Sequence, residues 1–141
     1  TSSESAYPMA MEAMEKFGVP RRISSFVLPM GYSFNLDGST LYLAMASVFV
    51  AQAAGVDLSI GQQLTMMLTL MLTTKGVAAV PRASIVVLSG TLAAFGLPLE
   101  GVALILGVDE FMDMARTAVN LLGNCLATAV IARAEGIQLV E

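Results

Sequence analysis

The chain has 141 residues and a mass of 14.7 kDa; 56% of its residues are hydrophobic, only 13% are charged, and the mean hydropathy is +0.76. A soluble domain of this size cannot usually bury so much apolar surface. A net charge of −4 without any basic run excludes a disordered or nucleic-acid-binding chain, and a single cysteine, Cys125, excludes a disulfide scaffold. The sequence has no histidine for an imidazole base or a His-based metal site. The class that remains is a membrane protein.

The N-terminal stretch is rich in hydroxyl groups (TSSES) and has neither an initiator Met nor the pattern of a signal sequence. We therefore expect the chain to be the C-terminal part of a longer protein. Residues 8–17 (PMAMEAMEKF) predict an amphipathic helix with Glu12, Glu15 and Lys16 on its polar face. Hydroxyl and free N–H groups at the start of this helix would attract an anion, although an ordinary serine N-cap explains them equally well.

The segment from residue 23 to residue 56 contains one formal charge, Asp37, and exceeds the ~20 residues that cross a bilayer. Pro29 and the polar cluster NLDGST at 35–40 interrupt this segment, so we expect a membrane-spanning helix that is broken near its middle. Unwound carbonyl groups together with the Asn35 amide and the Asp37 carboxylate would suit a hard cation with oxygen ligands. The alternative is a helix restart with Asp37 or Ser39 as its N-cap.

Two short uncharged segments, 58–74 and 83–99, are joined by a connector of small apolar residues. As helices they would each be about 25 Å long, which is marginal against a hydrocarbon core of ~30 Å. We expect a re-entrant hairpin, whose irregular tip survives at membrane depth only where protein or a water-filled cavity satisfies its backbone. Two tilted spanning helices with a short loop are the alternative.

A long apolar helix is expected from residue 101 to residue 132. One face of this helix carries polar side chains at spacings of three and four residues: Asp109, Asp113, Arg116 and Asn120, with Thr117 beside them and Asn124 extending the stripe. Each ionisable residue costs ~2.5–3.5 kcal/mol at bilayer depth, so the stripe must face protein, water or a ligand. We interpret it as a ligand site rather than an Asp–Arg pair that only holds helices together.

The charges of this stripe indicate the ligand. Arg116 offers a planar fork that suits a carboxylate, and Asp113 can accept hydrogen bonds from an ammonium group. Thr117 and Asn120 can bind either end of a small polar molecule. An acidic amino acid, which is a zwitterion with an additional carboxylate, satisfies all of these groups. Ion channels, soluble helical bundles and purely structural membrane subunits are the other classes that the pattern leaves open.

Basic residues occur between residues 16 and 22 and at Arg133, whereas the connections around Asp57 and Glu100 contain none. If the broken helix crosses the membrane once and the last helix crosses back, all of these basic residues share one side. The positive-inside rule makes that side cytoplasmic. We therefore expect a multi-pass protein of the cell (inner) membrane, surrounded by lipid.

Four segments, SSESAYP, GYSFNLDGSTLY, TTKGVAAVP and GVDEFMDMARTAVNLLGN, resemble the dicarboxylate/amino acid:cation symporters, the glutamate transporter family. The resemblance covers essentially the whole chain in the right order. It implies an all-α transport domain with the second arm of hairpin 1 at 1–17, helix 7 at 22–56 with a break at 35–38, hairpin 2 at 58–96 and helix 8 at 99–134. It also implies a homotrimer and elevator-type secondary active symport of glutamate or aspartate, without enzyme chemistry or an organic cofactor.

The resemblance implies a role for particular residues. Substrate contacts are implied for Ser2 and Ser3 in hairpin 1, Ser39 at the Thr position of the family's NMDGT motif, Val80 and Ser84 in the hairpin 2 gate, and Asp113, Arg116, Thr117 and Asn120 in helix 8. The cation sites of sodium-coupled members would correspond to Gly31, Asn35, Asn120 and Asn124, to Asn35 and Asp37, and to backbone groups of Ser33, Thr74, Lys75 and Val77.

Two departures from the family pattern bear on the coupling ion and the substrate. Asn124 replaces an Asp of sodium-coupled members, which removes a negative charge from a cation site and favours H⁺ over Na⁺ as the coupling ion. Leu43 stands where amino-acid members often have Gln, a feature of the C4-dicarboxylate branch, so a C4-dicarboxylate symporter is the alternative. Asp113 favours an amino acid, because a dicarboxylate has no ammonium group. The candidates for carrying a coupled proton are Asp37, Asp109 and the substrate itself.

Overall fold

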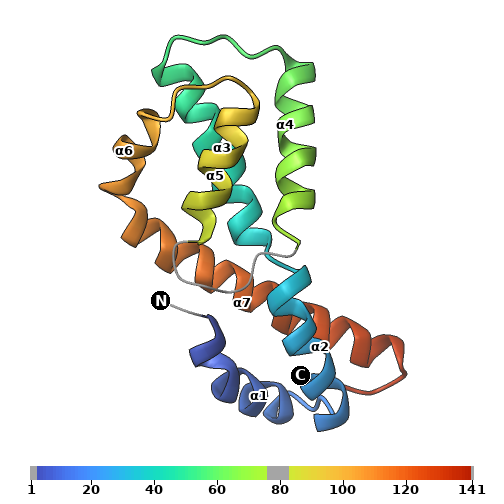
Figure 1. Cartoon of the computed structure of the whole chain (residues 1–141). Helices are drawn as coiled ribbons and strands as arrows, with labels where there is room; N and C mark the ends of the chain where they lie inside the picture. Colours follow the sequence, from blue (N-terminus) through green and yellow to red (C-terminus); the bar gives the residue numbers. More distant parts are fainter. Residues whose placement is uncertain (1–2, 76–82, 141) are drawn as a thin grey trace.

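The structure is a computed structural model that describes residues 3–75 and 83–140, and all regular secondary structure within these ranges is helical. A short 3-10 turn precedes the first of seven α-helices described there (Figure 1). The turn covers Ser3–Ala6, and the helices are α1 (Tyr7–Lys16), α2 (Arg21–Phe34), α3 (Asp37–Ala53), α4 (Ile60–Thr73), α5 (Ala83–Ala94), α6 (Gly101–Leu106) and α7 (Asp109–Ala134).

The helices pack into two groups, and α7 runs across both of them (Figure 1). One group surrounds α3, where Leu43, Met66, Leu70 and Leu88 form a buried cluster between α3, α4 and α5. The other brings α1 and α2 against the second half of α7, around the buried Leu28. Because α2 and α3 both have their most extensive contacts with α7, the junction between them lies directly against this helix.

Local sequence signals explain where the helices of the first group begin and end. Ser59 caps α4 through a capping box, in which its hydroxyl accepts a hydrogen bond from the Gln62 amide and the Gln62 side chain accepts one from the Ser59 amide. At the end of α5, Gly96 adopts a positive φ of 67°, and the next amide, Leu97 N–H, donates to the Leu92 carbonyl. This is the glycine-dependent turn that stops a helix and reverses the chain.

The junction between α2 and α3 is shorter than the sequence predicts. Only Asn35 and Leu36 separate the two helices, and α3 starts at Asp37. Pro29, which we expected to interrupt the segment, lies inside α2. A proline removes one helical hydrogen bond, but in an apolar setting neighbouring packing allows the helix to continue.

The last predicted helix is divided in two. We expected one helix from residue 101, but α6 ends at Leu106 and α7 begins at Asp109 after Gly107 and Val108. Val50 of α3 contacts the chain at Gly101, so α6 packs on α3 while α7 runs across the bundle in another direction (Figure 1). Glycine at 107 lowers the cost of this interruption.

Within residues 3–75 and 83–140, two stretches are long and apolar enough to cross a membrane: Arg21–Ala53, which contains α2 and α3, and Asp109–Ala134, which is α7. An 18-residue window within each stretch has a mean hydropathy of 1.2 and 1.3, respectively. Near one end of both stretches, Arg22 and Glu135 form an ion pair of 3.6 Å, so the start of α2 and the end of α7 lie together.

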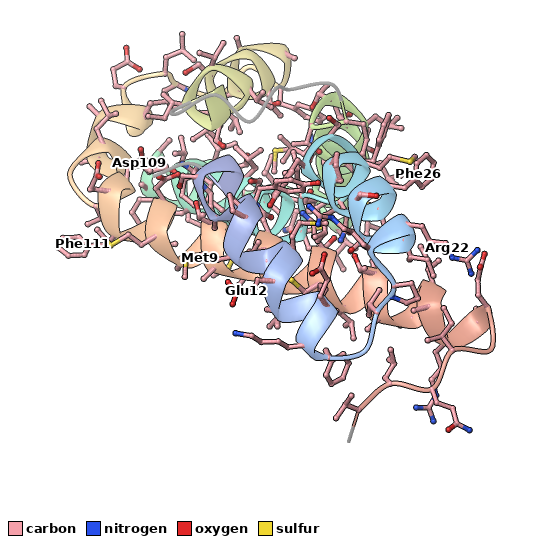
Figure 2. All side chains as sticks on the ribbon, turned by 90° about the horizontal axis from the view of Figure 1, so that it is seen from below. Met9, Glu12, Arg22, Phe26, Asp109 and Phe111 are labelled. Atoms are coloured by element: carbon pink, nitrogen blue, oxygen red, sulfur yellow. The ribbon has the colours of Figure 1, made fainter. Side chains whose placement is uncertain are left out.

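Large apolar side chains cover much of the outer surface. Figure 2 shows Phe26 of α2 and Phe111 of α7 directed away from the bundle, and these side chains are 66% and 74% exposed. The burial pattern is therefore reversed in places, with apolar groups outside and polar groups of α7 inside. Such a pattern is typical of a protein whose surroundings are lipid or further protein.

A close approach between backbones fixes α3 against α7. A Cβ atom on Gly38 would overlap the Arg116 carbonyl oxygen and would lie 3.0 Å from both the Arg116 Cα atom and the Val119 Cβ atom. Contacts this short require a shift of the backbone of α7, since the atoms that crowd Gly38 are not the ends of flexible side chains. Gly38 is therefore the position that lets the start of α3 touch α7.

Replacing this glycine should loosen the packing of α3 on α7. We expect Gly38→Ala to destabilise the protein by ~1–3 kcal/mol through overpacking, and to lower the midpoint of thermal unfolding in detergent. Gly61→Ala is a matched control, because Gly61 is also the second residue of its helix and no atom lies within 4 Å of an added Cβ. Equal unfolding midpoints for the two variants would contradict the close contact.

Candidate functional site

The polar stripe predicted on the last helix faces the interior of the protein. Along α7 the buried residues recur almost every four positions, and most of them are polar: Asp109, Arg116, Asn120, Asn124, Thr128 and Ala132. Asp113 and Thr117 lie at the edge of this stripe and are half-buried. The partners of the stripe are α3 and α2, which have their most extensive contacts with α7.

Arg116 is the centre of an ionic cluster at the N-terminal half of α7. Arg116 is only 6% exposed. Nε donates to Asp113 Oδ1 at 2.9 Å, Nη2 donates to the same oxygen, and Nη1 lies 4.0 Å from Asp109 Oδ1. Among the described residues, Nη1 has no hydrogen-bond partner. One guanidinium nitrogen therefore remains for a further acceptor, and a carboxylate is the acceptor that suits it best.

Tyr42 of α3 completes this cluster, and our sequence reasoning did not include it. Its hydroxyl donates to Asp109 Oδ1 at 2.8 Å, and the Arg116 guanidinium carbon lies 4.7 Å from the centre of its ring. The ring face attracts the cation and the hydroxyl fixes the carboxylate. The spacing in the sequence could have identified Tyr42, because it is three residues after Ser39 and therefore lies on the same face of α3.

Asn120 joins α7 to the first turn of α3. Its Oδ1 accepts from the Gly38 amide at 2.8 Å and from the Ser39 amide at 3.2 Å, and its Nδ2 donates to Ser39 Oγ at 3.0 Å. Amides in the first turn of a helix have no partner within the helix, so Asn120 acts as an N-cap supplied by another helix. The structure thus brings together two residues, Ser39 and Asn120, that the resemblance assigned to the substrate site.

A second polar cluster lies one turn further along α7, at the α2–α3 junction. Asn35 Nδ2 donates to Asn124 Oδ1 at 3.0 Å, and the Asn124 side chain packs against Gly31 of α2. Asn124 is completely buried, and its Nδ2 has no partner among the described residues. The Asp37 carboxylate lies close to Gly123, where an added Cβ would be 2.7 Å from Oδ2. Three of the four residues assigned to one cation site are therefore in mutual contact.

Among the described residues, the others predicted for the substrate and cation sites make none of the contacts within the two polar clusters. Ser33 is exposed, Thr74 is buried with its hydroxyl donating to the Leu70 carbonyl at 2.8 Å, and Lys75 reaches the Phe34 carbonyl. Ser84 is half-buried in the first turn of α5. Ser2, Val77 and Val80, and the side chain of Ser3, lie outside the described residues.

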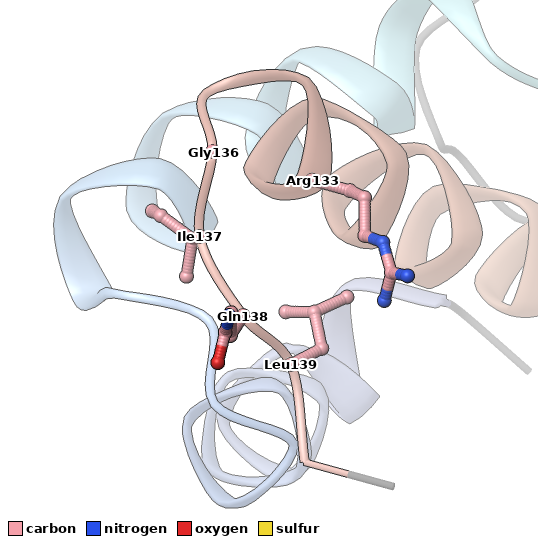
Figure 3. A pocket seen from close by; sticks show the side chains of 5 residues that line it. All are labelled: Arg133, Gly136, Ile137, Gln138 and Leu139. Carbon is pink, nitrogen blue, oxygen red and sulfur yellow. The ribbon is translucent and has the colours of Figure 1, made fainter.

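A separate hollow lies where the chain leaves α7. Figure 3 shows that Arg133 and the segment Gly136–Leu139 line it, and Val140 N–H donates to the Phe17 carbonyl beside it. This hollow is open and lies at the far end of α7 from Arg116. We assign no ligand to it, because none of its lining residues belongs to either polar cluster.

The sequence profile of the sodium:dicarboxylate symporter family matches residues 1–134. Among curated proteins, the proton/glutamate-aspartate symporter of Escherichia coli strain K12 is 58% identical over 134 residues, which are 95% of this chain and 31% of that protein. The proton/sodium-glutamate symport protein of Bacillus caldotenax is 56% identical over 135 residues, which are 96% of this chain and 32% of that protein.

A C4-dicarboxylate transport protein of Bacillus subtilis strain 168 is 54% identical over 136 residues, again 96% of this chain and 32% of that protein. The chain thus spans about a third of the length of the curated relatives that it matches. These names describe transporters rather than enzymes, and two of the three include a coupling cation. A family match over nearly every residue, together with a buried polar stripe in an apolar helix, leads to one conclusion: the chain belongs to the sodium:dicarboxylate symporter family.

Proposed function

We propose that this chain forms the substrate-binding part of a secondary active symporter that carries an acidic amino acid, glutamate or aspartate, together with a cation. The observation that supports this most directly is the buried Arg116 guanidinium, which lies between two carboxylates and keeps one nitrogen without a hydrogen-bond partner among the described residues. A buried cation with a spare donor is a receptor for an anion. The names of the relatives agree with a dicarboxylate or acidic amino acid as that anion.

The Arg116–Asp113 pair explains how a zwitterion would bind. In the structure, Arg116 and Asp113 neutralise each other. An amino acid with a side-chain carboxylate would present that carboxylate to Arg116 and its ammonium to Asp113, so that one internal pair is exchanged for two pairs with the ligand. This exchange leaves neither buried charge uncompensated, which would otherwise cost several kcal/mol.

The neighbouring polar groups would complete the pocket. Ser39 Oγ and the Asn120 amide are hydrogen-bonded to each other and can turn toward a substrate carboxylate or ammonium. Thr117 is half-buried next to Arg116 on α7. Tyr42 holds Asp109 and the face of Arg116, so it would orient the guanidinium for the ligand. Ser84, in the first turn of α5, would contribute from the hairpin.

Charge balance favours cation coupling. Asp109, Asp113 and Arg116 together carry one net negative charge when all three are ionised. An acidic amino acid also carries one, and each unbalanced charge at bilayer depth costs ~2.5–3.5 kcal/mol. Co-binding of cations or protons would remove this penalty, and mutual stabilisation of substrate and cation is the thermodynamic basis of symport.

The second polar cluster supports H⁺ rather than Na⁺ as the coupling ion. Gly31, Asn35, Asn120 and Asn124 are neutral, and Asn124 is paired with Asn35 through an N–H group that repels a cation. Asp37, beside the second cluster, and Asp109, within the ionic cluster, are each a candidate for carrying the proton. A sodium ion at this position would have only the Asp37 carboxylate to balance its charge, because Asn124 supplies no negative ligand.

The architecture fits the transport domain of such a symporter. We infer that α2 and α3 form one membrane-spanning helix, broken at Asn35 and Leu36, and that α7 crosses back. α4 has 14 residues and α5 has 12, so they are about 21 Å and 18 Å long and too short to cross a ~30 Å core, which favours a re-entrant hairpin. A homotrimeric, elevator-type protein of the bacterial inner membrane, about three times the length of this chain, is the assembly that we propose.

A C4-dicarboxylate symporter on the same fold is the second candidate. A relative with 54% identity has that name, and Leu43 is buried where amino-acid members often have Gln. A dicarboxylate has no ammonium group to pair with Asp113. When such a dianion binds at Arg116, its carboxylate would lie beside the carboxylates of Asp109 and Asp113, and like charges at this distance repel each other. Competition decides the matter: succinate should inhibit aspartate uptake poorly if the proposal is right.

The ammonium role of Asp113 can be tested directly. Asp113→Asn removes one charge and should lower kcat/KM for aspartate uptake into proteoliposomes by about 10- to 100-fold, as expected for a lost charged hydrogen bond. Succinate uptake should change much less, because succinate has no group for Asp113 to bind. Asp57→Asn, in the loop before α4, is the matched control. Equal losses for both substrates would refute the ammonium role.

The carboxylate role of Arg116 makes a separate prediction. We expect Arg116→Met to lower the affinity for glutamate about 100-fold and to shift preference toward neutral amino acids, measured by competition against a labelled substrate. Arg133→Met removes the same charge near the end of the same helix and should leave selectivity unchanged. Thermal unfolding of both variants controls for loss of folding. Retained glutamate affinity in folded Arg116→Met protein would eliminate the carboxylate clamp.

A further inference from the structure

The carboxyl end of α2 is an electronegative point within the protein. The last carbonyl groups of a helix have no partner inside it and carry partial negative charge. α2 ends at Phe34, its last turn contains no basic residue, and the carboxylate of Asp37 follows three positions later. This end lies at the α2–α3 junction beside the second polar cluster, where isolated negative charge is costly if the junction is at membrane depth.

A lysine from a distant part of the chain reaches this point. Lys75 follows α4, 41 residues after Phe34, and its Nζ donates to the Phe34 carbonyl oxygen at 2.5 Å. The chain's other lysine, Lys16, behaves differently and pairs with the Glu12 carboxylate of its own helix at 2.7 Å. Among the described residues, the structure gives the Lys75 ammonium this carbonyl and no carboxylate.

The contact has the chemistry of a cation site whose cation is covalently attached. A free monovalent cation at the end of a helix would be held by carbonyl oxygens, and an ammonium group satisfies the same oxygens with N–H donors. Because Lys75 is tethered to α4, it requires no ion from solution and loses no translational freedom on binding. It also joins the end of α4 to the α2–α3 junction.

We propose that the Lys75 ammonium is a resident cation at the carboxyl end of α2, so that this end of the helix needs no free monovalent cation. The idea deepens the proposed function, because it concerns the cation dependence of the same site. Its consequence is that removing the ammonium, while keeping most of the length of the side chain, should create a requirement for a small cation that the unaltered protein lacks.

Lys75→Met tests this with a nearly isosteric apolar side chain, and Lys16→Met removes the same charge from α1. Thermal unfolding of the purified protein is measured without substrate in sodium chloride and in choline chloride at equal ionic strength. We expect sodium to raise the unfolding midpoint of Lys75→Met by about 3 °C or more relative to choline at saturating concentration. The unaltered protein and Lys16→Met should show a smaller rise. Lys75→Arg, which keeps the charge, should behave like the unaltered protein.

The result that overturns the proposal is an identical sodium response in Lys75→Met and the unaltered protein, or a response in Lys75→Arg equal to that in Lys75→Met. These outcomes do not depend on transport, because no substrate is present; failure of the proposed function would appear separately, as an unaltered protein that takes up neither acidic amino acids nor dicarboxylates.

If Lys75→Met yields no folded protein in either salt, the proposal is tested by the chemical reactivity of the Lys75 amine in the unaltered protein. The Lys75 side chain is exposed, so a reductive methylation reagent can reach it. An ammonium held by a carbonyl should react more slowly than that of Lys16, whose exposed pair with Glu12 is weak. Equal rates of methylation, read by mass spectrometry, would contradict a held ammonium.

Discussion

The polar stripe of α7 can be buried only because the junction between α2 and α3 provides it with partners. Asn120 accepts the first amides of α3, and Asn124 accepts from the side chain of Asn35. Buried polar groups without partners would cost several kcal/mol each in an apolar environment, so the interrupted backbone and the polar helix stabilise each other. An uninterrupted helix would present no free amides, and an apolar α7 would leave those of α3 unsatisfied.

The same constraint determines the electrostatics of the candidate site. Arg116, Asp113 and Asp109 lie one to three turns before Asn120 on α7, and Tyr42 lies one turn after Gly38 on α3. The close backbone contact at Gly38 therefore brings the ionic cluster beside the α3 aromatic ring. Two carboxylates share a single guanidinium in this cluster. Such a site can bind both a carboxylate and a positive charge, which is the chemistry that the proposed cation-coupled symport of an acidic amino acid requires.

Several features could be predicted from the sequence, because they follow from helical periodicity and from the free-energy cost of placing a charge in a membrane. The spacing of Asp109, Arg116 and Asn120 predicts a shared helix face, and the cost of charge at bilayer depth predicts that this face turns inward. Both agree with the burial of these residues. Family membership was also accessible, since whole motifs match over nearly the full chain. The assignment of substrate and cation ligands stays a prediction, because it concerns molecules that bind to this arrangement.

The sequence by itself determined the apolar character of the chain, the helical structure of the described residues, the end of one helix near Asn35 and the face of α7 that carries the polar residues, because these depend on composition and local spacing. Only the tertiary structure decided that α2 continues through Pro29 and that Gly107 and Val108 divide the last helix. It also decided that Tyr42 contacts Asp109 and that Lys75 contacts the Phe34 carbonyl. These features depend on which helices pack together. Such contacts join residues 41 to 67 positions apart, and no local pattern encodes a distance of that kind.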